Sequence, residues 1–303
     1  MKLRKEISGL HLFDRISGLH VLFDEIKIPE KECMCSPRTL SIALTNKCNM
    51  NCNFCYAQKG SKDIDINFLK NFCKKIDELG VLEITLGGGE PFIYPNLVDF
   101  CNWIWENTSL GINITTNASL ITPKIINSIK DTVSTIRISI EAIDEEYDKI
   151  RNAKFKDINN IIKKLLNENI NTAINCTVLK GKVYNFENVI KYAIGNKVHD
   201  VLIIAQHKNG QNILSQDELN IIENIILKYK DQIQLNVTEN LGKLLNIDIL
   251  NDENVDEYSF LHLSVDKKIK LNSFSKKGIL IDNIENLKQI FSNQYEEIKR
   301  STT

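Results

Sequence analysis

Between residues 39 and 205, short apolar runs alternate with segments whose apolar residues recur every three or four positions. The short runs predict strands at 40–43, 82–86, 112–116, 135–141, 172–179 and 200–205. The periodic segments between them predict helices at 64–79, 97–105, 123–129, 158–166 and 186–193. Strands that alternate with helices form βα units around a parallel sheet. We therefore predict an α/β fold, either a long open sheet or a partial (β/α)6 TIM-like barrel.

The first residues of the chain have a different pattern. ISGLHLFD, from residue 7, is followed by the near repeat ISGLHVLFD, with a turn signal at 15–18. This predicts a β-hairpin ahead of the barrel. Two roles are open for the hairpin: it covers a sheet edge, or it docks an extended peptide as an added strand.

The last third of the chain is expected to leave the barrel after residue 206 as a small α+β extension. The pattern predicts a helix, a strand, an acidic loop, a hairpin and a terminal helix, at 218–230, 233–237, 252–257, 260–274 and 284–295. We accordingly divide the chain into an N-terminal hairpin and lead-in (1–38), a barrel (39–210) and a C-terminal extension (211–303).

Composition and charge narrow the class of protein. The formal net charge of the 303 residues is −1, so no basic surface indicates a nucleic-acid partner. No secretory signal follows MKLRKEISGL, and the longest apolar runs are far shorter than the ~20 residues that span a bilayer. We expect a soluble, cytoplasmic protein without a membrane partner. In a reducing compartment its eight cysteines are not a disulfide framework.

Three cysteines stand out, because Cys48, Cys52 and Cys55 directly follow the first barrel strand. Active groups of parallel α/β folds lie at this carboxyl end of the strands. A structural zinc site takes four ligands. A [4Fe–4S] cluster held by three thiolates instead keeps one iron open for another ligand. A zinc site or a four-cysteine cluster remains an alternative if Cys33 or Cys35 adds a ligand, although both precede the strand.

The spacing CxxxCxxC, with Phe54 and Tyr56 beside the third cysteine, resembles that of the radical S-adenosylmethionine enzymes. The resemblance spans roughly residues 39–205. It continues at the ends of the next three strands, in ITLGGGEPF, NITTNA and ISIEAIDEEYDKIRN, which start at residues 84, 113 and 138.

The resemblance implies that Cys48, Cys52 and Cys55 hold a [4Fe–4S] cluster. It also implies that S-adenosylmethionine is bound by Tyr56, Gly87, Gly88, Gly89, Glu90, Thr115, Asn117, Ser139 and Arg151, with Asn175 a further candidate. The glycines allow the backbone to approach a ligand closely. The guanidinium group of Arg151 can form two parallel hydrogen bonds to a carboxylate of the ligand. The alternative for Arg151 is a surface ion pair with Asp148 or Glu145.

The reaction implied by the resemblance is reductive cleavage of S-adenosylmethionine to a 5′-deoxyadenosyl radical that abstracts a substrate hydrogen. The cofactors carry the hard chemistry, so no catalytic side chain beyond the cluster ligands is assigned. A one-electron reductant such as flavodoxin or ferredoxin is an implied partner.

The order of elements after residue 206 resembles the SPASM/twitch tail of the peptide-modifying branch of this superfamily. Here, however, no cysteine follows Cys176, and Asn272 and Ser273 stand where such tails often have cysteine. We therefore expect a degenerate extension without an auxiliary cluster. Cys33 and Cys35 supply only two thiols, which is too few to indicate a second iron–sulfur cluster.

The expected activity is modification of a peptide or protein side chain, as in maturation of a ribosomally made peptide. The alternatives are a radical enzyme acting on a small metabolite and a non-catalytic iron–sulfur protein. Gln206 and His207 are expected near the mouth of the barrel, where they would touch substrate or belong to a surface loop.

Overall fold

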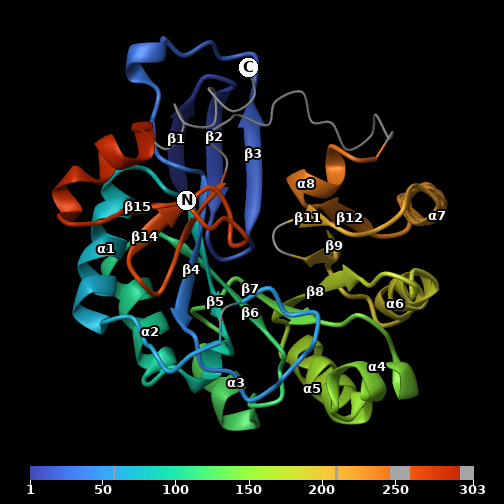
Figure 1. Ribbon diagram of the computed structural model, residues 1–303. Coiled ribbons are helices and arrows are strands. Elements are labelled where there is room, and N and C mark those ends of the chain that lie inside the picture. The colour runs from blue at the N-terminus through green and yellow to red at the C-terminus, as the bar shows by residue number, and fades with distance from the viewer. Residues whose placement is uncertain (58, 209–210, 246–259, 294–303) are drawn as a thin grey trace.

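The computed structural model describes residues 1–57, 59–208, 211–245 and 260–293. Within them, the largest sheet has the strand order β12-β9-β8-β7-β6-β5-β4-β13-β14-β15. Its middle consists of β4 (Thr39–Thr45), β5 (Glu83–Gly88), β6 (Gly111–Thr116), β7 (Thr135–Ser139), β8 (Asn171–Val178) and β9 (Asp200–Ala205). These strands pair in parallel and in chain order, which confirms the predicted α/β fold. The sheet curves as a partial barrel and does not close (Figure 1).

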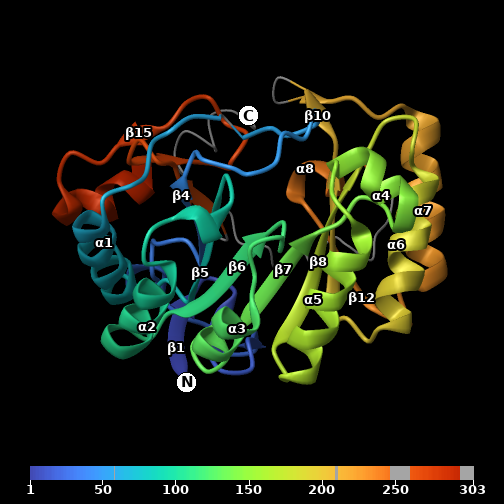
Figure 2. The same ribbon diagram turned by 90° about the horizontal axis from the view of Figure 1, so that it is seen from below.

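Helices cover the outer face of this sheet (Figure 2). They are α1 (Ile66–Glu78), α2 (Leu97–Asn107), α3 (Pro123–Ile129), α4 (Asp144–Arg151), α5 (Phe155–Asn167), α6 (Tyr184–Gly195) and α7 (Gln216–Tyr229). The helix starts follow local capping chemistry. The Asp65 carboxylate accepts a hydrogen bond from the Phe68 amide at 2.8 Å, and the Thr122 side chain caps α3 just before Pro123.

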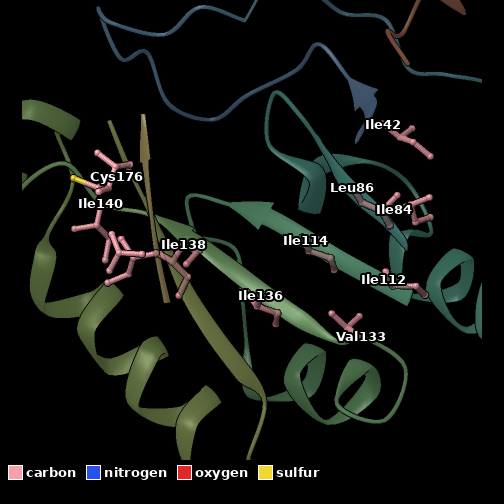
Figure 3. Packing of buried hydrophobic residues seen from close by; sticks show 14 of the residues in the cluster. Ile42, Ile84, Leu86, Ile112, Ile114, Val133, Ile136, Ile138, Ile140 and Cys176 are labelled. Atoms are coloured by element: carbon pink, nitrogen blue, oxygen red, sulfur yellow. The ribbon is translucent and has the colours of Figure 1, made fainter. Parts of the chain in front are cut away.

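The main core lies between the sheet and these helices. Figure 3 shows Ile84, Leu86, Ile112 and Ile114 from β5 and β6, all fully buried. Because side chains alternate between the faces of a strand, the residues between them face the barrel interior. Those interior positions are largely polar, and they lead up to the carboxyl ends of the strands.

Two strands from the last third of the chain lengthen the barrel sheet. β12 (Gln234–Val237) pairs in parallel with β9, and β13 (Phe260–Leu263) pairs in parallel with β4. The expectation that the chain leaves the barrel after residue 206 is therefore wrong for β12 and β13. Both strands satisfy backbone groups that the edge strands would otherwise leave unpaired. The domain boundary at residue 210 stays a prediction.

The remaining elements of the extension are short. The predicted hairpin is confirmed, with β13 antiparallel to β14 (Lys268–Lys270), and β15 (Ile279–Leu280) follows at the edge. β10 (His207–Lys208) pairs with β11 (Gln211–Asn212), and α8 spans Glu239–Gly242. A 3₁₀ turn at Ile284–Asn286 continues as a helix to residue 293. The predicted acidic loop at 252–257 and the end of the terminal helix lie outside the described residues.

The predicted N-terminal hairpin is present as β2 (Gly9–Asp14) and β3 (Leu19–Phe23), and β1 (Lys2–Glu6) makes it a three-stranded sheet. This sheet does not pair with an edge of the barrel sheet, so the expected edge-covering role is wrong. It packs against the amino ends of the barrel strands instead. Ser134 Oγ donates to the Arg15 carbonyl at 2.5 Å, and Asn171 Nδ2 donates to the Ser17 carbonyl at 3.0 Å. The sheet thereby covers the end of the barrel opposite the cysteines.

The helices in the described residues lack the combination of length and apolar character that crossing a bilayer requires.

The contact between the N-terminal sheet and the barrel can be tested at Gly111. A Cβ on this residue would lie 2.5 Å from Cζ of the buried Phe13 ring. Gly111→Ala should therefore lower the free energy of unfolding by about 1–3 kcal/mol through overpacking. Urea denaturation measures the change.

The matched control is Gly195→Ala, where an added Cβ meets nothing within 4 Å. This variant should stay within about 0.5 kcal/mol of wild type or be slightly more stable. Equal stability of the two variants would contradict the described packing of Phe13.

Candidate functional site

The glycine run at the end of β5 contacts the segment that leads to the first cysteine. The Gly89 amide donates to the Thr45 carbonyl at 2.7 Å, and the Glu90 amide donates to the Lys47 carbonyl at 2.8 Å. Gly88 has a φ of 122°, which side chains rarely adopt, and a Cβ on Gly89 would overlap the Lys47 carbonyl. Glycine is therefore needed here for a close approach between two backbones.

The side chain of Glu90 connects this junction to the end of β6. Its carboxylate, 1% exposed, accepts hydrogen bonds from Thr116 Oγ1 at 2.6 Å and the Asn117 amide at 2.9 Å. The Phe92 amide is a third donor at 3.2 Å. Burial raises the pKa of Glu90, and these hydrogen bonds oppose that rise only in part. Because both carboxylate oxygens have partners within the protein, Glu90 supports the strand ends.

The loop after β4 carries three free thiols. Cys48 and Cys55 are exposed, and Cys52 is half-buried. Asn49, next to the first cysteine, accepts a hydrogen bond from Asn117 Nδ2 at 3.0 Å. Its own Nδ2 donates to Ser119 Oγ at 2.8 Å. The loop is therefore fastened to the end of β6, and Asn117, predicted as a cofactor residue, has this structural partner.

Cys33 and Cys35 lie at the opposite end of β4. The Met34 amide between them donates to the Lys5 carbonyl of β1 at 2.9 Å. β4 itself, at about 3.3 Å per residue, puts roughly 20 Å between its two ends. Neither cysteine can join the loop thiols, so the alternatives that took a fourth ligand from them are wrong.

The three thiols of the loop are the type of ligand that an iron–sulfur cluster takes. Among the described residues, no three histidine, cysteine, aspartate or glutamate side chains are grouped to hold one metal ion. In a [4Fe–4S] cluster each thiolate binds a different iron atom, so the sulfur atoms stand farther apart than around zinc. Three thiols in one loop at the carboxyl end of the sheet fit such a cluster.

Arg151, the last residue of α4, points at this loop. Its Nε and Nη2 donate to the Glu141 carboxylate at 2.7 and 2.5 Å, and Nη1 lies 3.6 Å from Cys52 Sγ. The side chain is 8% exposed, so the alternative of a surface ion pair with Asp148 or Glu145 is wrong. Burial raises the pKa of the Cys52 thiol, and the charge of Arg151 opposes this rise.

Two of the buried polar atoms that lack partners among the described residues lie near this loop, one on β8 and one on α4. They are Asn175 Oδ1 and the Tyr147 hydroxyl. Burial raises the pKa of Tyr147 to about 12, so the hydroxyl keeps its proton. Ser139 is the register partner of Asn175 on the neighbouring strand. An unpaired buried polar group is costly, so these atoms suit a polar ligand.

A cavity of about 810 Å³ opens beside the cysteine loop. Its wall includes Cys55 and Tyr56, the start of β10, and the extension around β13 and β14. The Tyr56 and Phe274 rings lie 4.2 Å apart between centroids, and the Phe274 and His207 rings 4.6 Å. Gln206 and His207 line the cavity, which confirms their expected place near the mouth. In Figure 2 the blue segment after β4 passes between the red extension and β10.

The structure thus brings most predicted site residues to one end of the sheet. The thiol loop, the 87–90 segment, Asn117, Ser139 and Arg151 meet at the carboxyl ends of β4 to β7. A Cβ on Gly87 would lie 4.0 Å from Thr115 of β6. Tyr56, which directly follows Cys55, lies on the cavity wall with it. Their roles toward a cofactor stay predictions.

Sequence reasoning missed Glu141 and Tyr147 as site residues. Tyr147 lies four positions before Arg151, so both are on one face of α4. This spacing from Arg151 could have indicated that Tyr147 belongs to the same site. Glu141 lies two residues after the end of β7, where a buried carboxylate needs a cationic partner.

Comparison with known proteins agrees with this geometry. The chain is similar to GTP 3′,8-cyclase of Desulforamulus reducens, with 28% identity over 136 residues, 42% of this chain and 42% of the relative. It is similar to the sporulation killing factor maturation protein SkfB of Bacillus subtilis, with 27% identity over 166 residues, 51% of this chain and 39% of the relative. The matches thus span less than half of these relatives' own length.

The fold is similar to that of Streptococcus suis SuiB, solved bound to its precursor peptide SuiA, with a TM-score of 0.75. The alignment covers 98% of this chain and 88% of SuiB at 12% identity, so it shows a likeness of fold alone.

The model of the Radical SAM superfamily matches residues 42–193, from β4 to α6. Enzymes of this superfamily use a [4Fe–4S] cluster and S-adenosylmethionine. The matched region contains the thiol loop, the glycine run and the Arg151–Glu141 pair. Because the match covers just over half of the 303 residues, the chain belongs to the Radical SAM superfamily.

Proposed function

We propose that this protein is a radical enzyme that modifies a side chain of a peptide or protein. The observation that carries the proposal is the three-thiol loop beside the buried Arg151–Glu141 pair, at the edge of a large cavity. Cys48, Cys52 and Cys55 would hold the cluster, and residues 87–90, Thr115, Asn117, Ser139 and Arg151 would surround S-adenosylmethionine. When bound, these cofactors supply a 5′-deoxyadenosyl radical that abstracts a substrate hydrogen.

The protein's own groups position the reactants. Arg151 Nη1 brings a fixed positive charge to the thiol loop, where it favours thiolate at Cys52 and a ligand carboxylate nearby. Glu141 fixes the guanidinium plane through two hydrogen bonds. Gly89 and Glu90 hold the backbone before Cys48, so the thiol loop starts from a rigid point.

The cavity supports a peptide substrate. Its volume of about 810 Å³ is in the upper part of the range of ligand pockets, ~300–1,000 Å³. One wall belongs to the C-terminal extension, which lies beyond the family match. SuiB shares this fold over nearly the whole chain and was solved with a precursor peptide. SkfB, similar in sequence, is named as a maturation protein.

A small-molecule substrate is the second candidate. The sequence similarity to GTP 3′,8-cyclase favours it, because that relative acts on a nucleotide. Either reaction needs one electron for each cleavage, so we propose a small one-electron carrier such as flavodoxin or ferredoxin as a partner. Peptides encoded beside this gene are the first substrates to test. Their modification would support the proposed peptide-modifying function, whereas modification of GTP would support a small-molecule substrate.

The first prediction concerns the thiols. After anaerobic reconstitution with iron and sulfide, the protein should form 5′-deoxyadenosine from S-adenosylmethionine and dithionite. The variant with Cys48, Cys52 and Cys55 all changed to alanine should form none, because the cluster has lost its ligands. Chromatography of the nucleoside product measures this.

The matched control changes Cys33 and Cys35 to alanine. This variant should keep activity within about twofold of wild type, because these thiols lie at the other end of the barrel. Activity that depended on Cys33 and Cys35, or that survived the loss of the loop thiols, would contradict the assignment.

The second prediction concerns Arg151. Arg151→Lys removes the fork that binds Glu141, so S-adenosylmethionine should bind about tenfold more weakly to the reconstituted protein. Arg137→Lys is the matched control, because Arg137 forms a similar two-point pair with Asp200 at 2.7 and 3.1 Å inside the barrel. Equilibrium dialysis with labelled cofactor measures both. Equal weakening in the two variants would count against a cofactor role for Arg151.

A further inference from the structure

A row of polar side chains crosses three neighbouring strands beneath the cavity. Ser41 of β4 is the register partner of His262 of β13, and His262 is the register partner of Lys270 of β14. Register partners project from the same face of a sheet, with Cβ atoms about 5 Å apart. His262 and Lys270 both line the cavity. The row therefore places an imidazole and an ammonium group side by side on its wall.

His262 is held in place and stays uncharged. Its Nδ1 lies 2.7 Å from Ser41 Oγ, and the residue is 9% exposed. Burial, and next the charge of Lys270, lower the pKa of His262 to about 3. With Nδ1 engaged by Ser41, Nε2 is the ring nitrogen left for a group in the cavity.

The charge of the cavity wall is positive. Lys208, Lys270 and Lys276 line it, and the charge of Lys270 also acts on the carboxylate of Asp266 on the same wall. Asp266 is the one acidic residue among the lining residues, and Lys62 pairs with it at 2.7 Å. A cavity whose wall carries more positive than negative charge attracts ligands of the opposite sign.

We propose that Lys270 and His262 form a subsite for a carboxylate, and that the substrate is a peptide with an aspartate or glutamate side chain near the modified residue. This inference rests on the proposed peptide-modifying function and names its substrate class. The carboxylate would accept hydrogen bonds from Lys270 Nζ and from Nε2 of His262, with Ser41 Oγ donating to Nδ1. Lys208 and Lys276, both exposed, would draw the acidic segment toward the cavity.

A phosphate group is also negatively charged, but the residues of the cavity wall suit a phosphate less well than a carboxylate. No arginine is among the lining residues, and no residue of α1 to α8 lines the cavity, so no helix end reaches it. Arginine forks and helix N-termini are the usual partners of phosphate groups. One half-buried lysine beside one neutral imidazole matches the two oxygens of a single carboxylate.

The test compares two probes, acetyl-Gly-Glu-Gly-amide and acetyl-Gly-Gln-Gly-amide, which differ only in the charged group. Ligand-observed NMR titrations give their affinities for the full-length reconstituted protein with S-adenosylmethionine present. The glutamate peptide should bind about tenfold more tightly than the glutamine peptide, as expected of one charge-assisted contact. Lys270→Met should reduce this preference to about twofold or less, whereas the control Lys277→Met, at an exposed position outside the cavity, should keep it.

Each of three results in the peptide titrations would overturn the proposal: equal binding of both peptides to wild type, a preference that survives Lys270→Met, or GTP that displaces the glutamate peptide in a Lys270-dependent way. A fourth result concerns the cofactor. Weakened S-adenosylmethionine binding in Lys270→Met would also overturn it, by assigning Lys270 to the cofactor site. The assay requires no cofactor cleavage. Failure of this subsite is therefore distinguishable from failure to form 5′-deoxyadenosine, which would instead contradict the proposed function.

Discussion

The site depends on one close backbone contact, where Gly89 and Glu90 donate hydrogen bonds to the carbonyls of Thr45 and Lys47. This contact fixes the start of the thiol loop against the end of β5. The buried Glu90 carboxylate then ties the same point to β6, through Thr116 and Asn117. A larger residue at position 89 would push the loop away from the strand ends. The thiols, Arg151 and the unpaired polar atoms of Asn175 and Tyr147 are all positioned relative to this junction.

The same sheet joins the thiol loop to the C-terminal extension that lines the cavity. β13 extends the sheet beside β4, so the extension and the thiol loop are attached to neighbouring parts of one rigid element. The cavity between them therefore has a fixed wall, to which Tyr56, Phe274 and His207 contribute packed rings. The N-terminal sheet covers the opposite end of the barrel, which leaves the carboxyl ends of the strands as the place where polar groups converge.

Much of the architecture could be predicted from local patterns. The alternation of apolar runs and helical periods located the six strands and five of the six α-helices between residues 39 and 205 with small errors at their ends, and missed α4. β1 was missed because its sequence, KLRKE, has no apolar alternation. Its buried residues are Arg4 and Glu6, which pair with each other at 2.6 Å, so charge pairing takes the place of apolar burial.

Contacts between distant segments could not be predicted in this way. Nothing local indicates that β12 and β13 add to opposite edges of the sheet, since edge pairing depends on the completed barrel. The row of Ser41, His262 and Lys270 requires the register of three strands from two separate segments. By contrast, the thiol spacing and the glycine run are local motifs, and the sequence was sufficient to place them at one end of the barrel.

The central claim is that the loop thiols hold a cluster with an open iron to which S-adenosylmethionine binds. Electron paramagnetic resonance of the reduced, reconstituted protein tests this most directly. The account predicts a [4Fe–4S] signal that changes when S-adenosylmethionine is added and that is lost when the three loop cysteines are replaced. A signal that the cofactor leaves unchanged, or that persists without those cysteines, would contradict it.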